Sequence, residues 1–127
     1  TQLGGSMIPR IIDEVPILAI AATQAHGITV IRDAEELRFK ESDRIESITS
    51  NLKKMGAKIR DTKDGMVIEG PVKLKGAEID SKGDHRIAMA FSIAGLTAEG
   101  ETVINNIDCV NTSFPGFFEQ LESLRCE

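Results

Sequence analysis

The seven residues "GITVIRD" at positions 27–33 return as "GETVINN" at positions 100–106, an offset of 73 residues. In both copies a glycine precedes a run of β-branched residues, a composition that favours a short β-strand. Each copy also follows an apolar helical segment that opens on an aspartate, Asp13 in the first case and Asp84 in the second. This repetition predicts one folding unit that is used twice.

The first copy is expected to alternate strands with helices. Residues 7–12 are predicted to form a short strand, residues 13–24 a helix and residues 28–31 a second strand. Asp13 is placed to cap the helix, because an aspartate side chain accepts hydrogen bonds from the free N–H groups at a helix start. The helix is apolar on nearly all sides, so we expect it to be buried.

A second helix and a hairpin complete the first copy. Apolar residues recur at helical spacing over residues 45–55, and Asp64-Gly65 separates two stretches typical of a β-hairpin. The second copy repeats a strand within residues 74–80 and a helix capped by Asp84. The sequence stops before a second hairpin is reached.

This order of elements predicts an α/β (α+β) fold with helices packed on sheet. The repeat units are expected at about residues 7–74 and 77–127, the second one truncated. A missing strand pair would leave an open sheet edge, which folded proteins generally avoid. We therefore expect the chain to be part of an incomplete domain of a larger protein.

Composition limits the possible functions. The net charge of −5 argues against a nucleic-acid partner, which usually requires a basic face. No apolar run approaches the roughly 20 residues that span a membrane and no secretory leader is visible, so a cytoplasmic protein is expected. Cys109 and Cys126 have neither metal-ligand nor disulfide spacing and are expected to be inert thiols. No metal and no cofactor is predicted.

Charged residues gather at three predicted helix starts: Asp13-Glu14, residues 40–44 ("KESDR") and residues 84–86 ("DHR"). A helix N-terminus offers free N–H groups and about half a positive charge, which suits a phosphate or a carboxylate. Arg44 and Arg86 lie at this positive end, an unfavourable place for a cation. An anion bound jointly by the arginine and the helix N-terminus would compensate for this unfavourable placement.

Structural explanations compete with this one. Asp13 and Asp84 can serve only as helix caps. Glu41 and Arg44 are three residues apart and fit an exposed ion pair worth about 0.2–0.5 kcal/mol. A lone histidine such as His85 is more often structural or solvated than catalytic. Spacing alone leaves these alternatives open.

Three motifs resemble those of one enzyme family. "RFKESDRI" (38–45) resembles the K-E-(S/T)-D-R-(I/L) signature of the 5-enolpyruvylshikimate-3-phosphate (EPSP) synthase family. "GDHRIAMAF" (83–91) resembles its D-H-R-(M/I)-A-M motif, and "IPRIIDEVPILAIAAT" (8–23) its I-D-E-x-P segment. The three motifs occur in the order and at the spacing of the family, and the similarity covers essentially the whole chain. Their residues are most like those of bacterial members.

The resemblance implies a two-domain enzyme of repeated βαβαββ units, the inverse α/β barrel of enolpyruvyl transferases. This chain would belong to an incomplete second domain. The implied reaction transfers enolpyruvyl from phosphoenolpyruvate to the 5-hydroxyl of shikimate 3-phosphate and releases phosphate. The missing N-terminal domain would supply the rest of the site, so we expect the isolated fragment to be inactive.

The same resemblance implies three catalytic residues. The attacking hydroxyl must lose a proton while the methylene of phosphoenolpyruvate gains one, which requires acid–base groups on two sides. By match to the family, Asp13 would contact the shikimate hydroxyls and accept the proton, and Glu41 would handle the methylene proton. Lys40 would lie near the attacking oxygen and balance charge.

Substrate-binding roles are implied for Arg44 and Arg86, which would hold the carboxylate and phosphate of phosphoenolpyruvate, and for His85, which would line the same pocket. Guanidinium groups suit this task because they donate paired hydrogen bonds. One position departs from the family pattern, since Thr112 stands where many members carry a lysine. That change bears on affinity for phosphoenolpyruvate and for glyphosate, which competes for the pocket in the family.

Two alternatives are kept. The related UDP-N-acetylglucosamine enolpyruvyl transferases share the architecture and the donor substrate. A non-catalytic α/β repeat domain would instead use the charged helix starts to bind a partner.

Overall fold

The repeated segments form strands that occupy equivalent positions in the fold. β2 (Gly27–Ile31) follows helix α2 (Val15–Gln24), and β6 (Val103–Asn105) follows helix α4 (His85–Thr97). Both glycines that open the repeated segments have a positive φ, 101° at Gly27 and 85° at Gly100. Asp33 and Asn106, which close them, have φ values of 61° and 60°. The two copies thus share backbone conformation as well as sequence.

The computed structural model describes residues 1–106 and residue 116. The positions of Cys109, Thr112 and Cys126 lie outside the described residues. Within the described ranges, no helix has both the length and the apolar character needed to cross a membrane.

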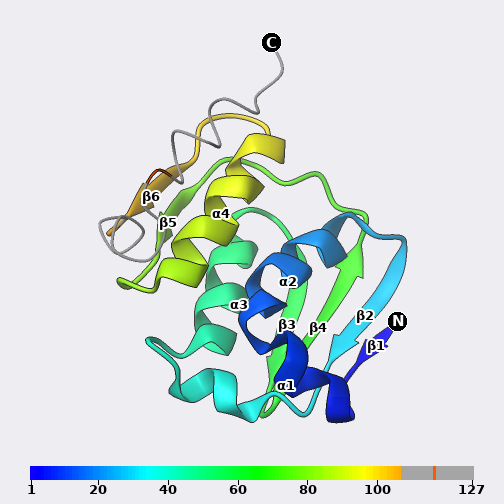
Figure 1. Ribbon diagram of the computed structural model, residues 1–127. Helices are drawn as coiled ribbons and strands as arrows, with labels where there is room; N and C mark the ends of the chain where they lie inside the picture. The colour runs from blue at the N-terminus through cyan, green and yellow to red at the C-terminus, as the bar shows by residue number, and fades with distance from the viewer. Residues whose placement is uncertain (107–115, 117–127) are drawn as a thin grey trace.

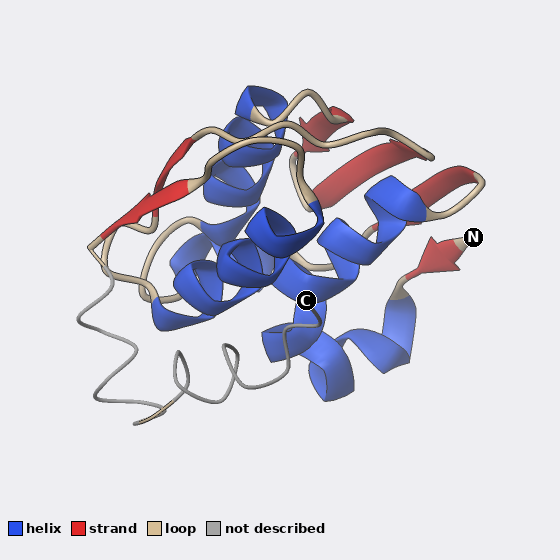
Figure 2. Cartoon of the chain, turned by 90° about the horizontal axis from the view of Figure 1, so that it is seen from above, coloured by secondary structure: helices blue, strands red, loops and turns tan. Residues whose placement is uncertain are grey.

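Two sheets lie along the outside of the packed helices (Figures 1 and 2). The first has the order β1-β2-β4-β3, formed by β1 (Gln2–Leu3), β2, β4 (Gly65–Gly70) and β3 (Lys58–Thr62). β1 is parallel to β2, whereas β4 is antiparallel to both of its neighbours. The second sheet pairs β5 (Glu78–Asp80) with β6 in parallel. Each unit therefore contains a parallel strand pair joined through a helix, and the predicted α/β class is confirmed.

Helix α3 (Arg44–Lys54) has the amphipathic pattern that the sequence predicts. Ile45, Ile48, Leu52 and, just past the helix end, Met55 are all fully buried. Asp43 caps the helix by accepting a hydrogen bond from the N–H of Glu46 at 3.0 Å. Burial of an apolar stripe on one face explains why this helix packs between β3 and the second unit.

The predicted β-hairpin is also present, with a turn one residue earlier than expected. Thr62 pairs with Gly65, so Lys63 and Asp64 form the turn and Gly65 begins β4. A Cβ atom at Gly65 would lie 1.8 Å from the carbonyl oxygen of Ile31. Glycine is needed there because another backbone approaches closely, not because the turn needs it.

The strand predicted over residues 7–12 is wrong. The chain is helical there, with η1 (Gly5–Met7), α1 (Ile8–Ile11) and η2 (Ile12–Glu14) in succession. Pro9 lies in the first turn of α1, where a missing N–H is tolerated. The isoleucines suggested a strand, but tertiary packing, which buries Ile8, overrides so short a local preference.

The predicted capping role of Asp13 is wrong as well. Asp13 belongs to η2, and α2 begins two residues later without any side-chain cap hydrogen bond. Its carboxylate is directed instead to two arginines, Arg44 and Arg86.

Candidate active site

One buried arginine joins the three charged segments. Arg44, the first residue of α3, has a side chain only 1% exposed. It donates from Nε to Oδ2 of Asp84 at 2.8 Å, from Nη2 to Oδ1 of Asp84 at 3.2 Å and from Nη1 to Oδ1 of Asp13 at 3.2 Å. Nη2 also donates to Oε2 of Glu41. Carboxylates from η2, from the segment before α3 and from the start of α4 therefore converge on a single guanidinium.

Asp84 is the fully buried partner in this network. As predicted, it caps α4, since Oδ1 accepts a hydrogen bond from the N–H of Arg86 at 3.0 Å. Oδ2 accepts a further hydrogen bond from the hydroxyl of Ser42 at 2.8 Å, besides the one from Arg44. Local sequence around Asp84 indicated a helix cap only. No local pattern predicts that this aspartate contacts Arg44 and Ser42, which lie some 40 residues away.

The buried pair remains charged. Burial disfavours the ionised form of Asp84, but hydrogen bonds from Arg44 and Ser42 outweigh it and lower the pKa of the carboxyl group. Burial likewise acts against the charge on Arg44, yet the hydrogen bonds and charge of Asp84, with Glu41 and Asp13, raise the pKa of the guanidinium. Each group is thus stabilised in its ionised form by the other.

The segment between η3 (Glu35–Phe39) and α3 presents the predicted proton-handling residues. The Glu41 side chain is 54% exposed although one of its oxygens is held by Arg44. Lys40, its neighbour, forms no ion pair with any residue in the part of the chain that the structure describes. Glu41 is therefore accessible to a ligand, and the ammonium group of Lys40, which is partly exposed, is not engaged by a described carboxylate.

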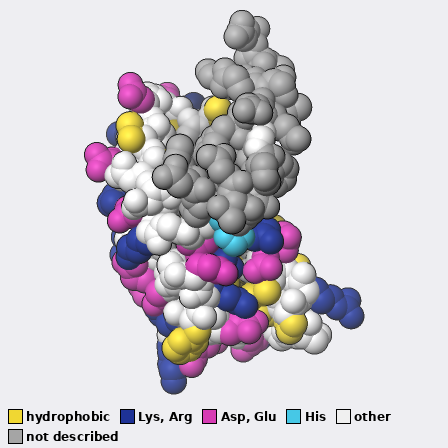
Figure 3. All heavy atoms as spheres, turned by 60° about the vertical axis from the view of Figure 1, so that its left-hand side comes forward, with side chains coloured by type: hydrophobic (Ala, Val, Ile, Leu, Met, Phe, Trp, Pro, Cys, Tyr) yellow, Lys and Arg dark blue, Asp and Glu magenta, His cyan; other side chains and the backbone are white. Residues whose placement is uncertain are grey.

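Arg86 and Asp13 face each other across the starts of α4 and α2. Nη2 of Arg86 lies 3.7 Å from Oδ2 of Asp13, and the Arg86 side chain is 36% exposed. Acidic and basic side chains surround a histidine on the face seen in Figure 3. A groove of about 210 Å³ begins here, lined by Asp13, Glu14, Arg86 and apolar residues of α2 and α4.

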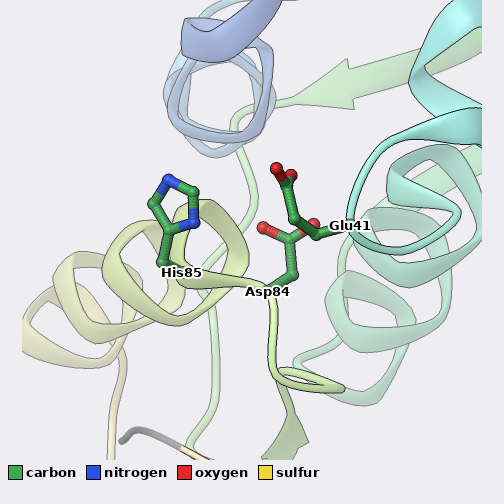
Figure 4. A group of neighbouring side chains, drawn as sticks. All are labelled: Glu41, Asp84 and His85. Carbon is green, nitrogen blue, oxygen red and sulfur yellow. The ribbon is translucent and has the colours of Figure 1, made fainter. Parts of the chain in front are cut away.

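Glu41, Asp84 and His85 bring ligand-type atoms within 4.8 Å of one another (Figure 4). This set does not fit a metal ion, because both Asp84 oxygens already accept hydrogen bonds from Arg44, Ser42 and the backbone. A cation would have to compete with a buried guanidinium for the same oxygens.

The structure thus brings together most of the residues singled out in the sequence. Asp13, Glu41, Arg44 and Arg86 are joined by ion pairs, and His85 lies beside Glu41. The Glu41–Arg44 pair at i, i+3 is present, but Arg44 is buried, so the pair is not the exposed one that spacing alone allowed.

Comparison with known proteins agrees with these motifs. The family model described as EPSP synthase (3-phosphoshikimate 1-carboxyvinyltransferase) matches residues 2–121. The 3-phosphoshikimate 1-carboxyvinyltransferase of Alkaliphilus oremlandii is 62% identical over 120 residues, which are 94% of this chain and 28% of the relative. The protein of the same name from Thermoanaerobacter sp. is 59% identical over 123 residues, 97% of this chain and 29% of the relative.

A solved structure shows the same likeness in three dimensions. The EPSP synthase from Acinetobacter baumannii superposes with a TM-score of 0.92 at 45% identity, over 97% of this chain and 29% of the other. The chain therefore spans somewhat more than a quarter of the length of the relatives it matches. On its motifs, its fold and these similarities, the chain belongs to the EPSP synthase family.

Proposed function

We propose that the full-length protein transfers enolpyruvyl from phosphoenolpyruvate to the 5-hydroxyl of shikimate 3-phosphate. The observation that carries this proposal is the network around Arg44, in which one buried guanidinium orients Asp13, Glu41 and Asp84. Carboxylates fixed in this way are prepared for proton transfer, since little reorganisation is needed when the reaction begins. Membership of the EPSP synthase family supplies the reaction.

Asp13 and Glu41 are the proposed acid–base groups. Their side chains are 46% and 54% exposed, so each can meet a substrate while one oxygen holds Arg44. The second oxygen of Asp13 has only the 3.7 Å contact with Arg86. Asp13 would accept the hydroxyl proton of shikimate 3-phosphate, and Glu41 would transfer a proton at the methylene carbon. Lys40, unpaired among the described residues, would balance charge at the attacking oxygen.

Arg86 is the more accessible of the two proposed anion ligands. Four of the five N–H groups of Arg44 are directed to protein carboxylates, which leaves one on Nη1 for an anion. Arg86 has a single long contact to Asp13 and remains one-third exposed. We therefore assign the main contact with phosphoenolpyruvate to Arg86, with Arg44 chiefly holding the carboxylates and His85 lining the pocket.

The charges of the site explain why the rest of the protein would be needed. Among the predicted site residues, three carboxylates (Asp13, Glu41, Asp84) and three cations (Lys40, Arg44, Arg86) cancel in formal charge, and Glu14 adds a carboxylate at the groove. Both substrates carry a phosphate and a carboxylate. The predicted site residues within the described part of the chain leave no net positive charge for these anions, and we propose that the N-terminal domain supplies further cationic groups. The isolated chain is expected to be inactive. A cytoplasmic location is a further prediction for the protein, as are the limits of the two repeat units at residues 7–74 and 77–127.

The decisive experiment follows phosphate release by the purified full-length protein with both substrates. We expect turnover with wild type and a loss on the order of a hundredfold or more in kcat with Glu41→Gln, which cannot transfer a proton. Glu69→Gln is the matched control, because Glu69 is exposed on β4 and paired only with Lys58 among the described residues. Turnover of UDP-N-acetylglucosamine in place of shikimate 3-phosphate, or no turnover by wild type, would refute the proposed function.

A further inference from the structure

Arg38, at the end of η3, connects two segments that are distant in sequence. Its guanidinium donates from Nη1 to Oδ2 of Asp43 at 2.9 Å, and thus reaches the N-cap residue of α3. On its other side it donates from Nε to the carbonyl of Lys63 at 2.9 Å and from Nη2 to the carbonyl of Thr62 at 2.7 Å. A longer contact of 3.4 Å runs from Nη2 to Oδ2 of Asp61. Arg38 therefore links the end of β3 and the β3–β4 turn to the start of α3 through hydrogen bonds.

This connection closes a short loop that carries Lys40, Glu41 and Ser42. In the described part of the chain, no backbone–backbone hydrogen bond joins residues 40–42 to a neighbouring strand or to α4. The loop is held at its two ends, where the side chain of Arg38 reaches Asp43 five residues on. Glu41 and Ser42 have further side-chain contacts to Arg44 and Asp84, whereas Lys40 has no such contact among the residues that the structure describes and depends on this closure.

The Arg38–Asp43 pair has a geometry that other side chains cannot reproduce. Asp43 divides its carboxylate, with Oδ1 accepting the N–H of Glu46 and Oδ2 accepting Arg38. The hydrogen bond that Arg38 donates to Asp43 is the largest influence on Arg38 and raises the pKa of its guanidinium. Donors on three nitrogens reach the helix cap and two carbonyls at once, which a lysine with one ammonium group cannot do.

We propose that Arg38 is a positioning residue for enolpyruvyl transfer, acting through the loop that presents Lys40. This inference rests on the proposed function, and Arg38 itself does not touch the reacting atoms. Without it the loop is free to shift, and a displacement of about 1 Å in a catalytic group can reduce turnover on the order of a hundredfold.

The test uses the full-length protein with Arg38→Gln and Arg38→Lys. Both variants should lower kcat ten- to a hundredfold, with KM for either substrate changed less than about threefold. Arg60→Gln is the matched control, since Arg60 is exposed on β3 and has no ion pair among the residues described. If Arg38→Lys retains wild-type kcat, the proposed guanidinium geometry is wrong.

A double-mutant cycle separates positioning from a general structural effect. In a Lys40→Gln background, Arg38→Gln should lower kcat by less than about a further threefold, because the group being positioned has already been removed. Fold-losses that simply multiply would show that Arg38 acts elsewhere and would overturn the inference. Should Arg38→Gln fail to fold, Asp43→Asn can replace it, since asparagine caps a helix equally well but lacks the charge that holds Arg38.

Hydrogen exchange supplies a readout that does not depend on activity. The amides of Glu46 and Ser47, which donate to the side chain and the carbonyl of Asp43, should exchange faster in Arg38→Gln than in wild type, while those of α4 stay unchanged. Unchanged exchange at Glu46 and Ser47 would overturn the positioning role even in an active enzyme. Conversely, suppose that exchange is faster in the variant but the wild-type protein does not transfer enolpyruvyl. The role of Arg38 in holding the loop would then be supported, and only the proposed function would be refuted.

Discussion

Arg44 and Asp84 are 40 residues apart in sequence and form a two-point ion pair with exposed fractions of only 1% and 0%. Nε and Nη2 of the arginine each donate to a different carboxylate oxygen. The pair joins the start of α3, in the first repeat unit, to the start of α4, in the second. It therefore contributes to stability and to the site at once.

Replacing Asp84 should destabilise the full-length protein substantially. Asp84→Asn keeps the size of the side chain but leaves a buried guanidinium without its main counter-charge, at a cost of about 3 kcal/mol in the free energy of unfolding. Urea denaturation measures this loss. Glu99→Gln is the control, because Glu99 is 65% exposed in a surface pair and should change stability by less than about 0.5 kcal/mol. A loss below about 1 kcal/mol for Asp84→Asn would show that Glu41 and Asp13 are enough to balance the charge of the buried Arg44.

The same aspartate should make stability depend on acid pH. The pKa of Asp84 is lowered by folding, so its contribution is complete above the unfolded-state value of about 3.9 and is lost as pH falls through the folded-state value. The stability difference between wild type and Asp84→Asn should therefore shrink as pH decreases below about 4. Urea midpoints from pH 7 down to pH 3 test this, and a difference that stays constant would contradict it.

Asn51 provides a second, uncharged link between the units. Its Nδ2 donates to the carbonyl of Asp80 at 3.0 Å, and its Oδ1 accepts the N–H of Asp80 at 3.4 Å. Asn51→Ala would leave these backbone groups of β5 without partners, at a cost of about 1–3 kcal/mol in unfolding free energy. Faster exchange of the Asp80 amide, beside unchanged exchange in β3, is the expected signature. Equal protection of that amide in both proteins would argue against the link.

Gly65 should not tolerate a side chain. A Cβ at this position would lie 1.8 Å from the carbonyl oxygen of Ile31, so Gly65→Ala must displace β4 from β2. We expect a loss of about 1–3 kcal/mol in unfolding free energy. Gly5 offers a contrasting position, because its added Cβ meets nothing within 4 Å and only its φ of 65° opposes substitution. If Gly65→Ala is no less stable than wild type, the strands have room to separate.

Local patterns in the sequence identified much of the fold. The helical spacing of Ile45, Ile48 and Leu52 predicted α3 and its buried face, and the hairpin and the cap at Asp84 were also identified correctly. The family motifs predicted the membership that the comparisons then showed. The errors came at residues 7–12 and Asp13, where a short local preference competed with packing.

The sequence by itself therefore determined the features that depend on neighbours a few residues apart: helix faces, caps, a turn and a repeated motif. Only the tertiary structure decided which distant groups meet, such as Arg44 with Asp84, Arg38 with the β3–β4 turn, and Asp13 with two arginines. The physical reason is that periodicity and capping act within one or two turns of chain, whereas an ion pair across 40 residues depends on how whole elements pack.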